Sequence, residues 1–183
     1  VLDLDSLGSR LVTRRGQPAI LDESKSLAGC GIHHGIFVDN EPNLGGTRAS
    51  LAAHSCVVMG TWDEVCNIEG AVGRWLPLDH VPRLVELAAR LNGVNDIAVH
   101  QAISERAGKP GKFSVADLAG ALGEDVARRG LTLAMDQKKY FKSETKGAEL
   151  GRFLLSVGVP SQVDTVVRRF WEALQPLVKG VGA

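Results

Sequence analysis

Apolar residues recur at helical spacing through the last two thirds of the chain. Between residues 81 and 91, Leu84, Leu87, Ala88 and Leu91 fall three or four positions apart, and Gly93 follows them. Residues at this spacing share one face of an α-helix, which can be buried against neighbouring helices. Similar runs, bounded by capping residues and by glycine or proline, predict six or seven helices. They lie at about 61–76, 81–91, 95–106, 114–130, 133–141, 148–157 and 161–175.

Polar residues mark several of the predicted helix ends. Thr61 followed by Glu64, and Ser114 followed by Asp117, have the spacing of a capping box. In this motif a hydroxyl and a carboxylate satisfy backbone amides of the first turn. Pro176 has no amide hydrogen and is expected to end the last helix. These signals place helix starts near 61 and 114 and a helix end just before 176.

The first 60 residues follow a different pattern. Three short apolar runs, at 18–21, 35–38 and 55–59, have the length of β-strands and are separated by polar and glycine-rich segments. The stretch 39–47 has the composition of turns. We therefore expect residues 17–59 to form a small layer of strands and loops.

Composition places the chain among folded globular proteins. Hydrophobic residues make up 44% and charged residues 23% of its 183 positions, which excludes a disordered chain or a coiled coil. A chain of this length can bury roughly 70% of its unfolded surface. We predict one globular domain, residues 1–183, of the α-rich α+β class. A small N-terminal strand-and-loop layer (1–60) would pack on a bundle of about six to seven helices (61–178).

Two features of the sequence concern the location of the protein in the cell. No apolar run reaches the roughly 18 residues that a membrane-spanning helix needs. The three cysteines are too few, and odd in number, for a disulfide framework. These features predict a soluble, cytoplasmic protein without a membrane partner, unless a signal peptide has been removed.

Residues that can bind metal are concentrated between positions 30 and 66. This stretch holds all three cysteines and three of the five histidines. Cys30-x-x-His33 and His54-x-Cys56 have spacings at which two side chains can hold one ion, and zinc takes four such ligands. A hairpin-like return through 39–47 would bring the two pairs together. One hypothesis is therefore a zinc site formed by Cys30, His33, His54 and Cys56, and the other is ordinary core packing of the cysteines.

Cys30 also has the surroundings of a nucleophile. Gly29 and Gly31 flank it, which would let a substrate approach the backbone. A thiolate needs a neighbouring base to react near neutral pH, and His33, His34 and His54 are candidate bases. The second chemical hypothesis is therefore an enzyme, a hydrolase that acts on a small molecule, with catalytic Cys30, His34 and His54. Cys30 would then be the most reactive of the three thiols.

A helical binding or assembly protein is the alternative to an enzyme. Residues 1–104 hold 8 Lys/Arg against 12 Asp/Glu, and residues 105–183 hold 13 against 9. Basic residues beside aromatic rings, as in Lys138-Lys139-Tyr140 and Arg168-Arg169-Phe170, occur on surfaces that contact phosphates and bases. The basic C-terminal half could contact an acidic protein partner or nucleic acid, although dedicated nucleic-acid binders are much more basic. The concentration of reactive residues narrowly favours the enzyme.

Overall fold

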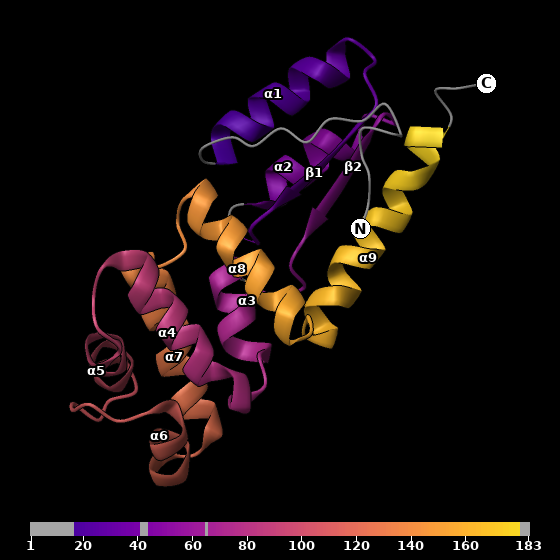
Figure 1. The fold of residues 1–183 in the computed structure, drawn as a ribbon. Coiled ribbons are helices and arrows are strands. Elements are labelled where there is room, and N and C mark those ends of the chain that lie inside the picture. The colour runs from indigo at the N-terminus through magenta and orange to yellow at the C-terminus, as the bar shows by residue number, and fades with distance from the viewer. Residues whose placement is uncertain (1–16, 41–43, 65, 180–183) are drawn as a thin grey trace. The chain divides into compact units, whose positions relative to one another are not determined.

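The computed structural model describes residues 17–40, 44–64 and 66–179 (Figure 1). Within these ranges it has nine α-helices and two parallel strands, so the predicted α-rich α+β class is confirmed. No helix in these ranges is long and apolar enough to cross a membrane. The chain divides into two compact units, which are described separately. Unit 1 contains the described residues up to Glu64 and helix α9 from Thr165 onward, and unit 2 is Cys66–Asp164.

Unit 1 is built on two parallel strands. β1 (His34–Val38) pairs with β2 (Val57–Thr61) along their whole length, and α2 (Leu44–Ala52) connects them. The predicted strands at 35–38 and 55–59 are confirmed, the second shifted by two residues. The predicted hairpin-like return is wrong, because parallel strands need a crossover connection and α2 provides it. Glycines that resembled a turn belong to this helix.

The first predicted strand, at 18–21, is also wrong. These residues lie in α1 (Gln17–Gly29). A four-residue apolar run fits a strand and a helix equally well, and proline is tolerated in the first turn of a helix. The helix contacts β1, while α2 contacts β2.

Two glycines allow α9 (Ser161–Lys179) to pack closely on one face of the sheet. A Cβ atom on Gly60 would lie 2.5 Å from Cδ2 of Phe170, and one on Gly35 would lie 2.8 Å from Cδ1 of Leu174. Side chains alternate along a strand, so Ile36 points to the opposite face, where it is buried on the side of α1 and α2. Unit 1 is therefore a three-layer arrangement of helix, sheet and helix.

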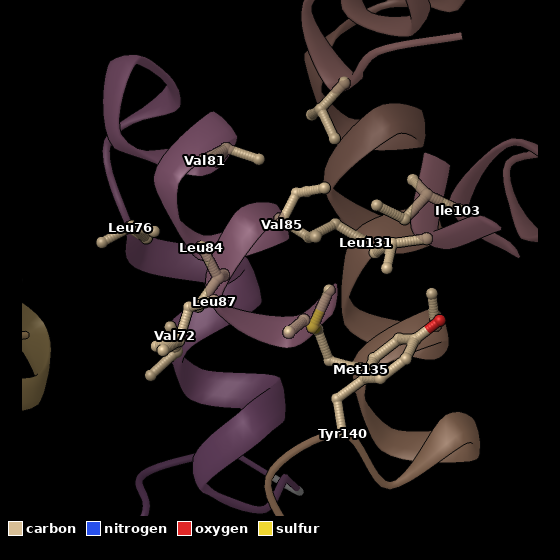
Figure 2. Packing of buried hydrophobic residues seen from close by; sticks show 14 of the residues in the cluster. Val72, Leu76, Val81, Leu84, Val85, Leu87, Ile103, Leu131, Met135 and Tyr140 are labelled. Carbon is tan, nitrogen blue, oxygen red and sulfur yellow. The ribbon is translucent and has the colours of Figure 1, made fainter. Parts of the chain in front are cut away.

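Unit 2 is entirely helical within its described residues. Its elements are α3 (Ile68–Trp75), a short 3₁₀ turn (Leu78–His80), α4 (Val81–Asn92), α5 (Asp96–Arg106), α6 (Val115–Leu122), α7 (Glu124–Lys138) and α8 (Glu144–Val157). Helix α7 contacts α3, α5 and α6, so it is the central element. Leucine, valine and isoleucine side chains, with Met135 and Tyr140, fill the space between the helices (Figure 2).

Several predicted helix ends need correction. The capping box at Ser114 and Asp117 is confirmed at the start of α6. The predicted start at Thr61 is wrong, because Thr61 pairs with Val38 in the sheet and α3 is capped by Asn67 instead. Pro176 lies inside α9 rather than ending it.

Gly130 does not end a helix either. It lies in the middle of α7, and the predicted helices 114–130 and 133–141 are replaced by α6 and α7, which meet at Gly123. A Cβ atom on Gly130 would lie 2.8 Å from Cβ of Ala107 and 2.9 Å from the carbonyl oxygen of Ile103. Gly130 is thus needed for the close approach of α5 and α7.

Candidate ligand-binding site

The segments that carry the predicted cysteine and histidine cluster do lie side by side. The amide of His34 donates a hydrogen bond of 2.9 Å to the carbonyl oxygen of Cys56. Residues 30–34 and 54–56 therefore meet at the amino ends of the two strands, through a parallel pairing.

The side chains of this cluster do not converge. Cys30 and His33 are exposed, whereas Cys56 is buried with its Sγ 3.9 Å from the carbonyl oxygen of Ala28. Among the described residues, no group of three or more His, Cys, Asp or Glu is placed to hold a metal ion, and all three cysteines are free. The zinc site at Cys30, His33, His54 and Cys56 and the catalytic role of Cys30 with His34 and His54 stay predictions.

His34 is already engaged by two other groups. Its Nε2 lies 2.7 Å from Oγ of Ser24, and its Nδ1 lies 2.7 Å from the carbonyl oxygen of Ile32. Since the carbonyl can only accept, Nδ1 carries the proton, and Nε2 accepts from the Ser24 hydroxyl. Serine hydrolases hold a histidine in the same way, but Ser24 is only 1% exposed. The pair therefore satisfies a buried hydroxyl and orients the ring of His34.

The four basic residues predicted to form one patch belong to different units. Lys138 and Lys139 end α7 in unit 2, whereas Arg168 and Arg169 lie on the part of α9 that belongs to unit 1. Arg169 forms an ion pair with Asp63. The patch therefore stays a prediction.

A groove of about 610 Å³ lies in unit 1, along β2 and between α2 and α9. Its size is in the range of small-ligand sites. It includes the carboxyl end of β2, and in sheets of parallel strands ligands bind beyond these ends. The lining residues are Arg48, Leu51 and Ala52 from α2, residues 57–63 from β2 and its continuation, and Val166, Arg169, Phe170 and Ala173 from α9.

Two buried polar atoms in residues of this groove lack a hydrogen-bond partner among the described residues. They are Oγ1 of Thr61 and Nε1 of Trp62. Trp62 is only 3% exposed, its ring meets Phe37 edge to face at 5.0 Å, and Asn40 donates to its carbonyl oxygen at 2.9 Å. An unpaired buried polar group costs about 1–3 kcal/mol, so these two atoms lower the stability of the end of β2 in the free protein.

The polar lining of the groove consists mainly of hydrogen-bond donors. Arg48 and Arg169 contribute guanidinium groups. Trp62 and Thr61 also line the groove, but the indole N–H of Trp62 and the hydroxyl of Thr61, which can donate or accept, are buried. Asp63 is the carboxylate of the lining, and it is paired with Arg169. The lining therefore complements a ligand that is negatively charged and rich in acceptors.

The sequence contained a signal for this site that composition did not reveal. Thr61, Trp62 and Asp63 follow an apolar run directly, as polar residues do at the end of a parallel strand. A hairpin-like return does not bring these residues to a ligand-binding edge, and the spacing of Thr61 and Glu64 predicts a helix cap instead. No protein-family model, curated protein or solved structure matches this chain.

Proposed function

We propose that unit 1 is a binding module whose groove along β2 takes an anionic, acceptor-rich ligand carrying a carboxylate or phosphate group. The observation that carries this proposal is the pair of buried, unpaired polar atoms, Thr61 Oγ1 and Trp62 Nε1, in residues that line one groove. Both atoms are shielded from solvent in the free protein, so a shift of the Trp62 side chain on binding would let an acceptor of the ligand reach the indole N–H, which can only donate.

The charged residues of the groove support the same ligand. A guanidinium group binds carboxylate or phosphate through two parallel hydrogen bonds. Arg48 comes from α2 and Arg169 from α9, so the two cations approach the groove from opposite walls. Leu51, Val166 and Ala173 line the same groove and suit an apolar part of the ligand.

Thr61→Val tests the proposal, because valine keeps the shape of threonine and removes its hydroxyl. In the free protein the change removes an unsatisfied buried group, so it should raise the free energy of unfolding by about 1 kcal/mol. In the same protein it should weaken binding of inorganic phosphate or of a dicarboxylate such as glutarate. Urea unfolding and titration calorimetry measure the two effects, and Arg83→Gln in unit 2 is the control.

Direct observation of Trp62 gives a second measurement. Its indole N–H signal should shift in an NMR titration with phosphate or glutarate, whereas the indole signal of Trp75 in unit 2 should not. If neither anion moves the Trp62 signal, or if Thr61→Val binds as tightly as the unchanged protein, the proposal is wrong.

A further inference from the structure

The register of the two strands determines which backbone groups of β2 face the groove. His34 lies opposite Val57, and its amide donates to the carbonyl of Cys56. In a parallel pair, a residue whose backbone faces the other strand forms hydrogen bonds with the two residues that flank the one opposite it. The backbone groups of Val58 and Gly60 therefore face β1, and those of Met59 and Thr61 point away from it.

The groove follows this outward edge. All five residues of β2 line it, with α2 and α9 as its walls. Among the described residues β2 pairs only with β1. A third strand would lie at this position, about 4.8 Å from β2, with a helix over each of its faces. The site therefore offers a row of backbone donors and acceptors as well as side chains.

We infer that the ligand is an extended peptide segment of a partner protein, which adds to β2 as a third strand. This inference rests on the proposed function, since it names the ligand of the same groove. Strand addition gives affinity through backbone hydrogen bonds, while alternate side chains give specificity. A single small anion could satisfy the side chains at the end of β2, but it would leave the outward backbone groups of Met59 unpaired.

The walls of the groove indicate the sequence of such a segment. On one side Leu51 and Ala52 are apolar and Arg48 is cationic, and on the other Phe170 and Ala173 are apolar and Arg169 is cationic. Alternate residues of an added strand face opposite walls. The segment should therefore have apolar residues in its centre and acidic residues at its ends.

A capped hexapeptide with the sequence Glu-Val-Thr-Val-Val-Glu is a suitable probe, because its glutamates at residues 1 and 6 face opposite walls, and Lys-Val-Thr-Val-Val-Lys is its charge control. Two N-methylated forms, one modified at residues 2, 4 and 6 and one at residues 1, 3 and 5, separate strand addition from other binding. Only alternate amides of an added strand face β2. The form methylated at those amides should bind about tenfold more weakly than the unmodified peptide, and the other form should bind nearly as tightly as the unmodified peptide. If both forms bind alike, or if the lysine peptide binds as well as the glutamate peptide, strand addition is wrong.

Met59→Pro tests the protein side. Proline removes the outward amide of β2 and leaves the pairing with β1 intact, as prolines do on edge strands. Peptide binding should be lost, whereas Arg83→Gln in unit 2 should bind the peptide like the unchanged protein. Circular dichroism establishes whether the variant is folded; if it is not, the N-methylated peptides decide alone. Binding of phosphate without binding of the peptide overturns strand addition and leaves the proposed function standing, whereas binding of neither overturns both.

Discussion

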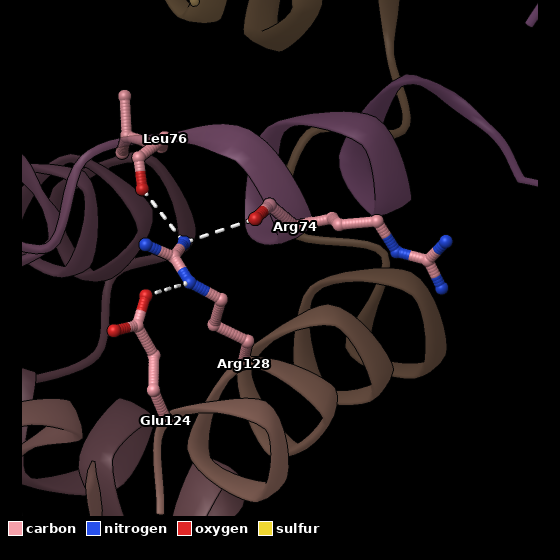
Figure 3. A network of polar contacts seen from close by, with 4 residues as sticks. All are labelled: Arg74, Leu76, Glu124 and Arg128. Atoms are coloured by element: carbon pink, nitrogen blue, oxygen red, sulfur yellow. Dashed lines mark hydrogen bonds and ion pairs between the residues drawn. The ribbon is translucent and has the colours of Figure 1, made fainter.

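The two units differ in how completely their buried polar groups are hydrogen-bonded. In unit 2, asparagine and serine side chains cap α3, α5, α6 and α8. Arg128 donates to the carbonyl oxygens of Arg74 and Leu76 at the end of α3 and pairs with Glu124 (Figure 3). Within the described part of unit 2, one buried side-chain atom, Nδ1 of His100, lacks a partner.

Unit 1, in contrast, leaves two such atoms on adjacent residues, Thr61 and Trp62, and both residues line one groove. Natural proteins usually break the rule that buried polar groups are paired where a function requires it. This difference supports the proposal that the end of β2 takes part in binding, whereas the paired polar groups of unit 2 stabilise its own helices. Each prediction below measures the stability of one unit or of both.

The largest effect is expected in the core of unit 2. Leu131 is fully buried in α7, among residues of the cluster shown in Figure 2. Leu131→Ala should lower the free energy of unfolding by about 2–5 kcal/mol, because it removes buried methyl groups and leaves a cavity. Leu155→Ala is the control in the same unit, since Leu155 is 76% exposed, and should have little effect. Urea unfolding compares the two, and equal losses would contradict the packing described for α7.

Arg128 is expected to have the next largest effect. Its side chain is only 18% exposed and joins the start of α7 to the end of α3. Arg128→Met keeps the aliphatic length but removes hydrogen bonds from a charged donor, each worth about 1.5–3 kcal/mol. The neighbouring Arg129 is exposed, so Arg129→Met is a matched control. Thermal unfolding that is unchanged in Arg128→Met would show that the carbonyls at the end of α3 are satisfied by water.

The parts of the fold that could be predicted from the sequence are those determined by residues close together in the chain. Gly93 and the pair Ser114 and Asp117 act within one turn of their own helices, and their predicted roles are confirmed. Thr61 has the same local pattern as a cap, but it lies in β2 opposite Val38, a residue more than twenty positions earlier. A glycine often ends a helix, and nothing near Gly130 in the sequence indicates otherwise. Its role depends on contacts with Ile103 and Ala107, which belong to another helix and its end.

The candidate site was hidden for the same reason. The predicted site residues are distinctive by their chemical type, but they lie before or at the starts of the strands: Cys30, His33, His34, His54 and Cys56. The groove consists of ordinary residue types, such as Leu51, Thr61 and Phe170, brought together from three elements. Finding it required the knowledge that the strands run in parallel and that α9 returns to the sheet.

Gly60 tests the close packing of unit 1. Gly60→Ala would place a methyl group against the ring of Phe170, and such overpacking costs about 1–3 kcal/mol. The neighbour is a side chain rather than backbone, so Phe170→Leu in the same protein should recover part of the loss. Gly130→Ala in unit 2 meets the backbone of α5, and should therefore be harder to relieve by a second substitution. Chemical unfolding of the single and double variants measures this difference, and the absence of any recovery in Gly60→Ala/Phe170→Leu would contradict the described contact.

The smallest effect concerns the pH dependence of the cap of α6. The hydroxyl and the amide of Ser114 donate to the carboxylate of Asp117, which lowers the pKa of Asp117 below its usual 3.8. A carboxylate with a lowered pKa in the folded state stabilises the protein above its unfolded pKa, and this stabilisation is lost as the pH falls through the folded value. The unchanged protein should therefore exceed Asp117→Asn in stability at pH 6, and the difference should shrink below pH 4.

Asp79→Asn is the control for this prediction, because Asp79 is exposed and forms no hydrogen bond among the described residues. Its difference from the unchanged protein should vary less with pH. Urea midpoints between pH 2.5 and pH 7 measure both variants under the same conditions. A difference for Asp117→Asn that stays constant over this range would mean that the carboxylate gains nothing from Ser114. The cap would then depend on the hydroxyl of Ser114 alone, which accepts from the amide of Asp117 whatever the charge of the carboxylate.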